Sequence, residues 1–351
     1  MRYFFKTIIV ASIVCFSGAA YAGNPDRAGQ AGATEVLIDP WAGSSGWGDV
    51  NTSSVHGVEA MFGNVAGTAF TKGTDIEFAH TIWLQGSDMS INAGGITQKV
   101  GPGSVMGISI MSFSFGDIPV TTVDQPEGGL GTFTPQFLNL SLSYAKAFSN
   151  SIYGGLNIKI ISESISNVSA SGVAIDAGIQ YVTGTNADKD NLKIGITLKN
   201  VGTPMKFGGD GLSTRITSTT TPSYEYTFEQ RTAGFEIPSL VRMGISYDIP
   251  LAKDHRLTPA LNFTSNSFTN DQYTAGVEYA FKEYFMLRGG FTYEQDVFDA
   301  SLRTTVFTGP SAGITLQPPL GKGGKRFGID YSFRATSPFQ GTHSFGIRFI
   351  L

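Results

Sequence analysis

The chain has 351 residues, of which 15% are charged, 12% are aromatic and 44 are glycine. The charged fraction lies well below the roughly 25% of an ordinary soluble domain, which argues against a surface that faces water on all sides. The formal net charge of −4 gives no reason to expect nucleic acid as a partner, and the single cysteine, Cys15, excludes an intramolecular disulfide.

The first 22 residues have the form of a secretory signal peptide. Basic residues precede an apolar run over residues 7–16, and a small-residue A-x-A pattern ends at Ala22. We expect cleavage after Ala22. A lipoprotein cleaved before Cys15 is the less favoured alternative, because Val14 suits that cleavage site poorly. The mature chain then has no cysteine, and no apolar run of about 18 residues that could form a transmembrane helix.

Residues 23–74 show no regular alternation of apolar and polar residues. This segment is rich in glycine, alanine and serine, with a short possible helix near residues 54–62. It differs clearly in pattern from the rest of the chain, so we treat it as a separate N-terminal segment.

From residue 75 onward the pattern has a period of two, which predicts β-strands. In the last segment Phe345, Ile347 and Phe349 share one face, and Gly346 and Arg348 share the other. Most segments have the roughly 9–11 residues that a tilted membrane strand needs. We predict fourteen strands, at residues 75–84, 88–100, 103–116, 137–148, 151–163, 170–183, 191–201, 238–248, 255–266, 271–282, 285–295, 308–317, 325–334 and 342–351.

These strands predict an all-β fold, a transmembrane antiparallel β-barrel of the bacterial outer membrane over residues 75–351. A secreted β-sandwich array is the competing fold, but it would normally carry more surface charge. Connection lengths favour the barrel. We expect both termini to be periplasmic. Connections after odd-numbered strands then face outward, and the long ones, 117–136, 202–237 and 296–307, all follow odd strands. Outer-membrane barrels have long external loops and short periplasmic turns.

Several charged residues fall on the polar face of the strands, which a barrel encloses. They are Lys159, Asp176, Arg242, Glu278, Arg288, Arg326, Asp330 and Arg348. We expect them to form structural ion pairs in a filled lumen, with Arg326, Asp330 and Arg348 as the leading set. The less favoured alternative is that they line a substrate path.

No stretch of the sequence carries a recognisable catalytic or metal-binding motif. The four histidines, His56, His80, His255 and His343, do not show a metal-ligand spacing. The basic turn at residues 321–325 lacks the Ser or Thr of a phosphate-binding loop. We therefore expect no enzymatic activity, no cofactor and no metal.

Three short motifs in the mature chain form a recognisable set. One joins Gly29-Gln-Ala-Gly-Ala33 to Gly46-Trp-Gly48, one joins residues 57–60 to Asn64-Val-Ala-Gly67, and one is Leu198-Lys-Asn-Val-Gly-Thr-Pro204. This set resembles the PorV/PorQ family of Bacteroidota outer-membrane proteins, which serve type IX secretion. That family shares the fourteen-stranded architecture of the long-chain fatty-acid transporters (FadL). Val65 stands where the family usually has proline.

The resemblance implies a FadL-like barrel in the outer membrane, with residues 23–74 as a plug in the lumen and Asn64 and Gly67 in the plug motif. It also implies a non-enzymatic role. PorV-like members shuttle secreted cargo with a C-terminal signal domain from the translocon to the attachment machinery, and PorQ-like members belong to that attachment complex. Extracellular loops would then contact the cargo, the translocon or the attachment-complex proteins.

The loop at residues 202–237 is the leading candidate for such contacts. Tyr224, Tyr226 and Phe228 form an alternating aromatic set, and such side chains are typical anchors of protein interfaces. Equally, they could extend two strands above the membrane as a hairpin. The segment at residues 121–134 is the second candidate loop.

The alternative function is a FadL-like channel for small hydrophobic molecules. It requires an apolar pocket in the lumen and a plug that opens. The inward faces of the strands argue mildly against it because they are mostly polar and charged, but the N-terminal segment could still supply an apolar cradle.

Overall fold

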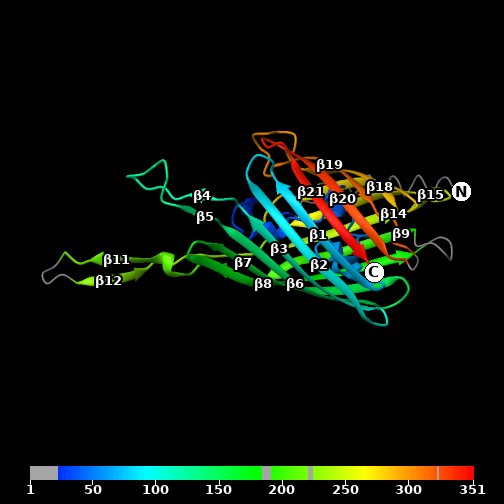
Figure 1. The fold of residues 1–351 in the computed structure, drawn as a ribbon, viewed down its shortest axis with the longest axis horizontal. Helices are drawn as coiled ribbons and strands as arrows, with labels where there is room; N and C mark the ends of the chain where they lie inside the picture. Colours follow the sequence, from blue (N-terminus) through cyan, green and yellow to red (C-terminus); the bar gives the residue numbers. More distant parts are fainter. Residues whose placement is uncertain (1–22, 184–190, 220–223, 322–323) are drawn as a thin grey trace.

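The computed structural model describes residues 23–183, 191–219, 224–321 and 324–351. The predicted signal peptide, residues 1–22, lies outside the described part of the chain. The chain forms a closed antiparallel β-barrel (Figure 1). Its strands are β1 (Thr74–Trp83), β2 (Met89–Gly101), β3 (Ser104–Ser114), β6 (Gln136–Ala147), β7 (Ile152–Ile165), β8 (Val168–Thr183), β9 (Leu192–Gly202), β14 (Leu240–Tyr247) with its continuation β15 (Ile249–Ala252), β16 (His255–Asn266), β17 (Gln272–Phe281), β18 (Phe285–Glu294), β19 (Phe307–Leu316), β20 (Arg326–Thr336) and β21 (Thr342–Ile350).

Each strand pairs with its neighbour in the chain, and β1 pairs with β21 to close the barrel. The long connection after β9 does not break this order, because β14 pairs with both β9 and β16. The fourteen predicted strands are confirmed. Their predicted ends differ from the observed ones by at most two residues, except that β15 lengthens the eighth strand.

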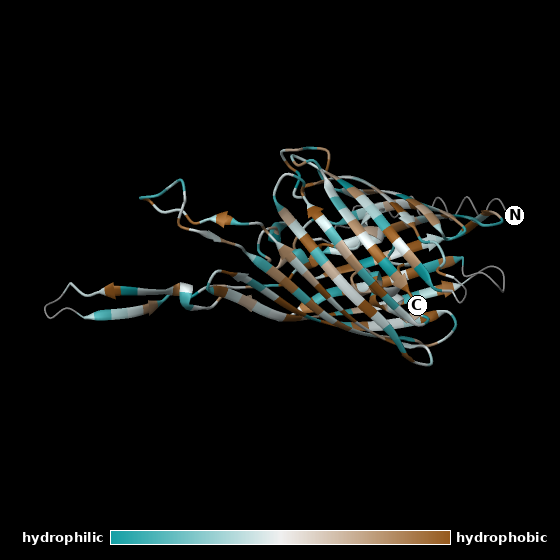
Figure 2. Ribbon diagram, in the orientation of Figure 1, coloured by the Kyte–Doolittle hydropathy of each residue, from teal (hydrophilic) through white to brown (hydrophobic). Residues whose placement is uncertain are grey.

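Along the strands, apolar side chains point out of the barrel and polar side chains point into it, which is the reverse of a soluble β-sandwich. On β7, Ile158 is 49% exposed on the outside whereas Lys159 is fully buried inside. Figure 2 shows apolar residues alternating with polar ones along the barrel strands. An apolar exterior around a polar interior is the arrangement that a lipid solvent requires.

The two ends of the barrel differ. We call the end with the short connections, where Leu351 lies, the turn end, and the other the loop end. The loop end carries the long connections, and two hairpins project from it (Figure 1). They are β4 (Ile118–Pro119) with β5 (Thr132–Phe133), and β11 (Ser213–Thr217) with β12 (Glu225–Glu229).

Residues 23–73 precede the barrel in the chain and run through its interior. They contain short helices only, η1 (Pro25–Arg27), η2 (Thr34–Leu37), α2 (Ala42–Ser45), η3 (Gly57–Met61) and η4 (Val65–Phe70). Within the described residues, no helix has the length and apolar character needed to cross a membrane. Of residues 41–68, all but Ser54 and His56 are buried.

The described residues begin and end at opposite ends of the barrel. Our expectation that both termini are periplasmic stays a prediction, because residues 1–22 lie outside the described part of the chain. The first described residues lie at the loop end, where Asn24 N–H donates to the carbonyl of Asn266 (3.3 Å). Leu351 lies at the turn end and donates to the carbonyl of Thr74 (2.8 Å). The reason is that the N-terminal segment enters the lumen at the loop end and traverses it before β1 begins.

Candidate functional site

A two-stranded hairpin at the loop end stands clear of the barrel (Figure 1). All ten residues of β11 and β12 are exposed, and Ile216 lies opposite Tyr226. Because alternate residues of a strand share a face, Tyr224, Tyr226 and Phe228 line one face together with Ile216. The three aromatic side chains are 51–55% exposed. Of the two predicted roles for this loop, the hairpin is present, and partner contact stays a prediction.

The base of this loop is anchored to the N-terminal segment. Strands β10 (Met205–Lys206) and β13 (Gly234–Phe235) pair, and Met205 belongs to a buried apolar cluster with Val36. Arg27 adds an ion pair to Glu236 at 3.0 Å. The hairpin therefore projects from a base that residues 27–36 hold to the barrel.

The second candidate loop has fewer paired residues than the first. Only Ile118 with Phe133 and Pro119 with Thr132 pair at its base in the described residues. Within it Val123 is 99% exposed. The predicted segment 121–134 thus lies at the loop end beside the aromatic hairpin, with few side-chain contacts of its own.

Inside the barrel, glycines on the inner faces of the strands receive the plug. A Cβ added at Gly195 would lie 2.3 Å from the carbonyl oxygen of Thr52, and one at Gly290 would lie 2.3 Å from that of Trp47. The same holds around most of the wall, where such a Cβ would lie within 3.0 Å of the plug. These positions are Gly95, Gly107, Gly155, Gly178, Gly195, Gly244, Gly276, Gly290 and Gly313. The plug backbone fits against the wall because these residues have no side chain.

The plug motif explains how the segment is fixed. Asn64 is fully buried, its Oδ1 accepts from Ala66 N–H (3.2 Å), and its Nδ2 donates to the carbonyls of Thr52 and Ile179 (both 3.0 Å). One side chain thus caps η4 and joins two parts of the plug to β8. Gly67 is required by space, because a Cβ there would lie 2.0 Å from the carbonyl oxygen of Val55. The sequence analysis placed Asn64 and Gly67 in the plug motif but did not predict these contacts.

The lumen charges are paired, though not all as a single set. Arg348 contacts Glu59 of the plug and lies 3.1 Å from Glu77 and 3.7 Å from Asp330. Arg326 does not join them, since its Nη1 donates to the backbone carbonyl of Glu283 (3.0 Å). The structure therefore brings Asp330 and Arg348 together and places Arg326 at the turn end.

Four further ion pairs link charged residues inside the barrel. Lys159 and Asp176 lie 2.6 Å apart and are both buried. Arg334 pairs with Asp49 of the plug at 3.0 Å, a contact the sequence did not suggest. Glu278 lies between Arg288 (2.6 Å) and Arg256 (2.8 Å). Arg242, also predicted to face inward, donates to Thr264 Oγ1 (3.2 Å).

One group of carboxylates in the described residues has the spacing of a metal site. Oxygen atoms of Glu59, Glu77 and Asp330 lie within 4.8 Å of one another. Arg348 contacts all three, so a guanidinium already supplies the positive charge that a metal ion would bring.

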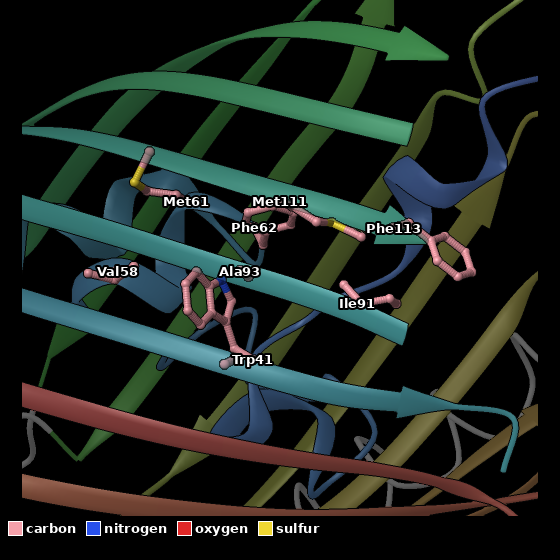
Figure 3. Packing of buried hydrophobic residues seen from close by; sticks show 9 residues of the cluster. Trp41, Val58, Met61, Phe62, Ile91, Ala93, Met111 and Phe113 are labelled. Atoms are coloured by element: carbon pink, nitrogen blue, oxygen red, sulfur yellow. The ribbon is translucent and has the colours of Figure 1, made fainter. Parts of the chain in front are cut away.

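The lumen also contains an apolar cluster that the strand pattern underestimated. Trp41 and Phe62 of the plug pack against β1, β2 and β3, as Figure 3 shows. Around them the aromatic rings of Trp83, Phe113 and Phe137 continue the cluster at the loop end. The inner face is thus not uniformly polar. The signal that was overlooked is the pair of inward apolar residues on neighbouring strands, Ile91 and Phe113.

Two carboxyl groups of the N-terminal segment lack a cationic partner. Burial raises the pKa of Glu35 to about 8, and the nearby charge of Glu163 adds to this effect. Neither carboxyl oxygen of Glu35 has a hydrogen-bond partner in the described residues. Burial, followed by the charge of Asp49, also raises the pKa of Asp39 well above its usual range. In both groups burial disfavours the charged form.

Comparison with known proteins identifies the fold. No protein-family model matches the chain, and no curated protein matches it. Among solved structures, the Ralstonia pickettii toluene transporter TbuX is similar at 11% identity, with a TM-score of 0.53 over 89% of this chain and 98% of that one. The Pseudomonas putida toluene transporter TodX gives the same score at 11% identity, over 89% and 97%. The deltaS2S3 mutant of the monoaromatic hydrocarbon channel TodX gives 0.55 at 13% identity, over 88% and 96%. The chain therefore shares the fold of these transporters, a FadL-like antiparallel β-barrel.

Proposed function

We propose that this barrel is an outer-membrane component of type IX protein secretion, with the loop end as its working surface. It binds secreted cargo, or proteins of the translocon or attachment complex, through the hairpin of β11 and β12. The observation that carries the proposal is the exposed aromatic face of Tyr224, Tyr226 and Phe228, on a hairpin whose ten strand residues are all exposed. Exposed aromatic side chains are the usual anchors of protein interfaces.

The closed lumen gives this proposal further support. Plug backbone lies directly against inward glycines such as Gly195 and Gly290, so plug and wall are in contact at these positions. Any transport through the barrel would need the plug to move, whereas binding at the loop end would not. Long loops face the cell exterior in outer-membrane barrels, which is the side where secreted cargo is delivered.

The test is a pull-down of the tagged protein from gently solubilised outer membranes, compared with a variant in which a short turn replaces residues 210–231. The paired base of β10 and β13 stays in place in that variant, so the barrel is expected to fold. We expect the intact protein to retain the large translocon barrel or cargo that still carries its C-terminal signal domain, and the shortened protein to lose them. A barrel recovered alone in both cases would contradict the proposal.

The second candidate function is a channel for small hydrophobic molecules. Two observations favour it, the aromatic lining of Trp83, Phe113 and Phe137 at the loop end, and the fold shared with toluene transporters. Its test is uptake of a monoaromatic hydrocarbon by cells with the intact barrel, compared with Phe113→Arg. An uptake defect without an export defect would favour the channel, and an export defect in the hairpin variant alone would favour the secretion role.

A further inference from the structure

The outer, membrane-facing surface carries a groove across β6, β7, β8 and β9. Its volume is about 610 Å³. Its outward-facing lining residues are almost all apolar and come from these four neighbouring strands. They are Tyr144, Lys146, Phe148, Gly154, Leu156, Ala177, Ile179, Ile196 and Leu198.

The groove exists because small residues stand among large ones on adjacent strands. Gly154 pairs with Lys146 on one side and Ile179 on the other, while Ala177 pairs with Leu156 and Leu198. At Ala177 the sheet surface carries only one methyl group, so it lies below the level of its aliphatic neighbours, whereas the ring of Phe148 packs over Gly154 and forms one end of the groove. A flexible hydrocarbon chain can fill such a depression better than a protein side chain that is fixed to the wall.

One end of the groove carries a positive charge. Lys146 is exposed on the last turn-end residues of β6 and has no acidic partner among the described residues. Tyr144, two residues earlier, is also exposed on the outer face, and its hydroxyl lies 3.2 Å from Ser104 Oγ. Aromatic residues and lysines at the rim of a membrane barrel lie at the level of the lipid head groups. The apolar groove and the cation are therefore at the depths of an acyl chain and of a phosphate.

We propose that this groove is a binding site for one phospholipid, with its phosphate at Lys146 and one acyl chain passing over Ala177. Lipid A fits the site less well, since it carries several chains and more than one phosphate, and the groove offers a single lysine. The proposal does not depend on the secretion role. It requires only that the barrel lies in a membrane.

A second depression on the same outer surface supplies a matched control. It has a volume of about 400 Å³ and spans β16, β17 and β18, with aromatic residues and Ala275 but no basic residue in its lining. If acyl-chain packing alone held lipids, the two depressions would behave alike. If the phosphate contact matters, only the groove with Lys146 retains a lipid.

The experiment is native mass spectrometry of the full mature protein released from nanodiscs of phosphatidylethanolamine and phosphatidylglycerol. We expect one phospholipid to remain bound. A lysine near the head groups contributes enough for Lys146→Gln to lower the affinity about fivefold. Ala177→Phe should fill the groove and lower it further, whereas Ala275→Phe should leave the bound fraction unchanged.

Folding is checked for each variant by heat-shifted migration in gels. Should Ala177→Phe fail to fold, Lys146→Gln still decides, because its side chain makes no ion pair or hydrogen bond within the described structure. Equal lipid retention in wild type and Lys146→Gln would overturn the proposal. So would retention of added lipid A in place of phospholipid.

Discussion

The hairpin of β11 and β12 and the plug in the lumen differ in how far they are buried. In the plug, nearly every residue from 41 to 68 is buried, and residues such as Asn64 and Asn51 hydrogen-bond to the wall or to other plug residues. In the hairpin, all ten strand residues are exposed and each strand has one open edge. The plug is thus closely packed inside the barrel, and the hairpin has an uncovered surface at the loop end that a partner can reach.

This difference has an energetic side. A single two-stranded hairpin is at best marginally stable in water, so its apolar face gains from any surface that covers it. The plug has no such unmet requirement, since inward glycines and paired charges already accommodate it. Changes in the lumen should therefore alter stability and closure, and changes in the hairpin should alter binding.

The largest effect is expected from breaking the charge network that ties the plug to the wall. Arg348→Met leaves Glu59, Glu77 and Asp330 buried beside one another without their cation. Removing one partner of a buried ion pair costs about 3–5 kcal/mol. We expect a loss of this size in the free energy of unfolding, measured by urea titration with tryptophan fluorescence, because Trp41 and Trp47 are buried in the lumen.

Arg326→Met is the matched control. That arginine lies half-buried at the turn end, where its side chain meets a backbone carbonyl and the ring of Tyr284 and forms no ion pair within the described residues. A loss below about 1 kcal/mol is expected, because no buried carboxylate is left without its cation. Equal effects of the two substitutions would show that the lumen network does not fix the plug.

A smaller effect follows from adding a side chain where plug and wall meet. Gly290→Val places a Cβ 2.3 Å from the carbonyl oxygen of Trp47 in the starting geometry, so the plug must shift. Overpacking of this kind costs about 1–3 kcal/mol. We expect reduced stability and a measurable conductance in planar bilayers. Gly289→Val, on the outer face with open space around it, should change neither.

The barrel could be predicted from the sequence because lipid imposes a period of two on every strand, and fourteen strands repeat the signal. The plug has no such repeat. Its position depends on single contacts between distant residues, such as Glu59 with Arg348 and Asp49 with Arg334. The inward glycines were visible in the sequence, but a glycine on a polar face looks the same whether it faces water or the carbonyl of Trp47.

The acidic residues near the loop end allow a test of the lumen by pH. Since the pKa of Glu35 is raised from 4.5 to about 8, its protonated form is favoured in the folded state. Stability from this group is complete below about pH 4.5 and is lost as the pH rises through 8, by about 1.4 kcal/mol per pH unit at most. We expect Glu35→Gln to flatten this decline, measured by urea unfolding between pH 5 and 8.5. An unchanged slope would mean that Glu35 does not titrate in the folded barrel.

Substitutions on the aromatic face of the hairpin should have the smallest effect on stability and the largest effect on partner binding. Replacing Tyr224, Tyr226 and Phe228 by serine removes the apolar face of the hairpin without touching the barrel. Exposed substitutions usually change stability by no more than about 0.5 kcal/mol. We expect an unchanged unfolding curve and a loss of the retained translocon or cargo proteins. Serine at Arg215, Glu225 and Glu229, on the other face of the same hairpin, is the control and should keep them. If both triple variants retain their partners, the aromatic face is not the contact surface, and the channel becomes the stronger explanation for a barrel with an aromatic cluster at its mouth.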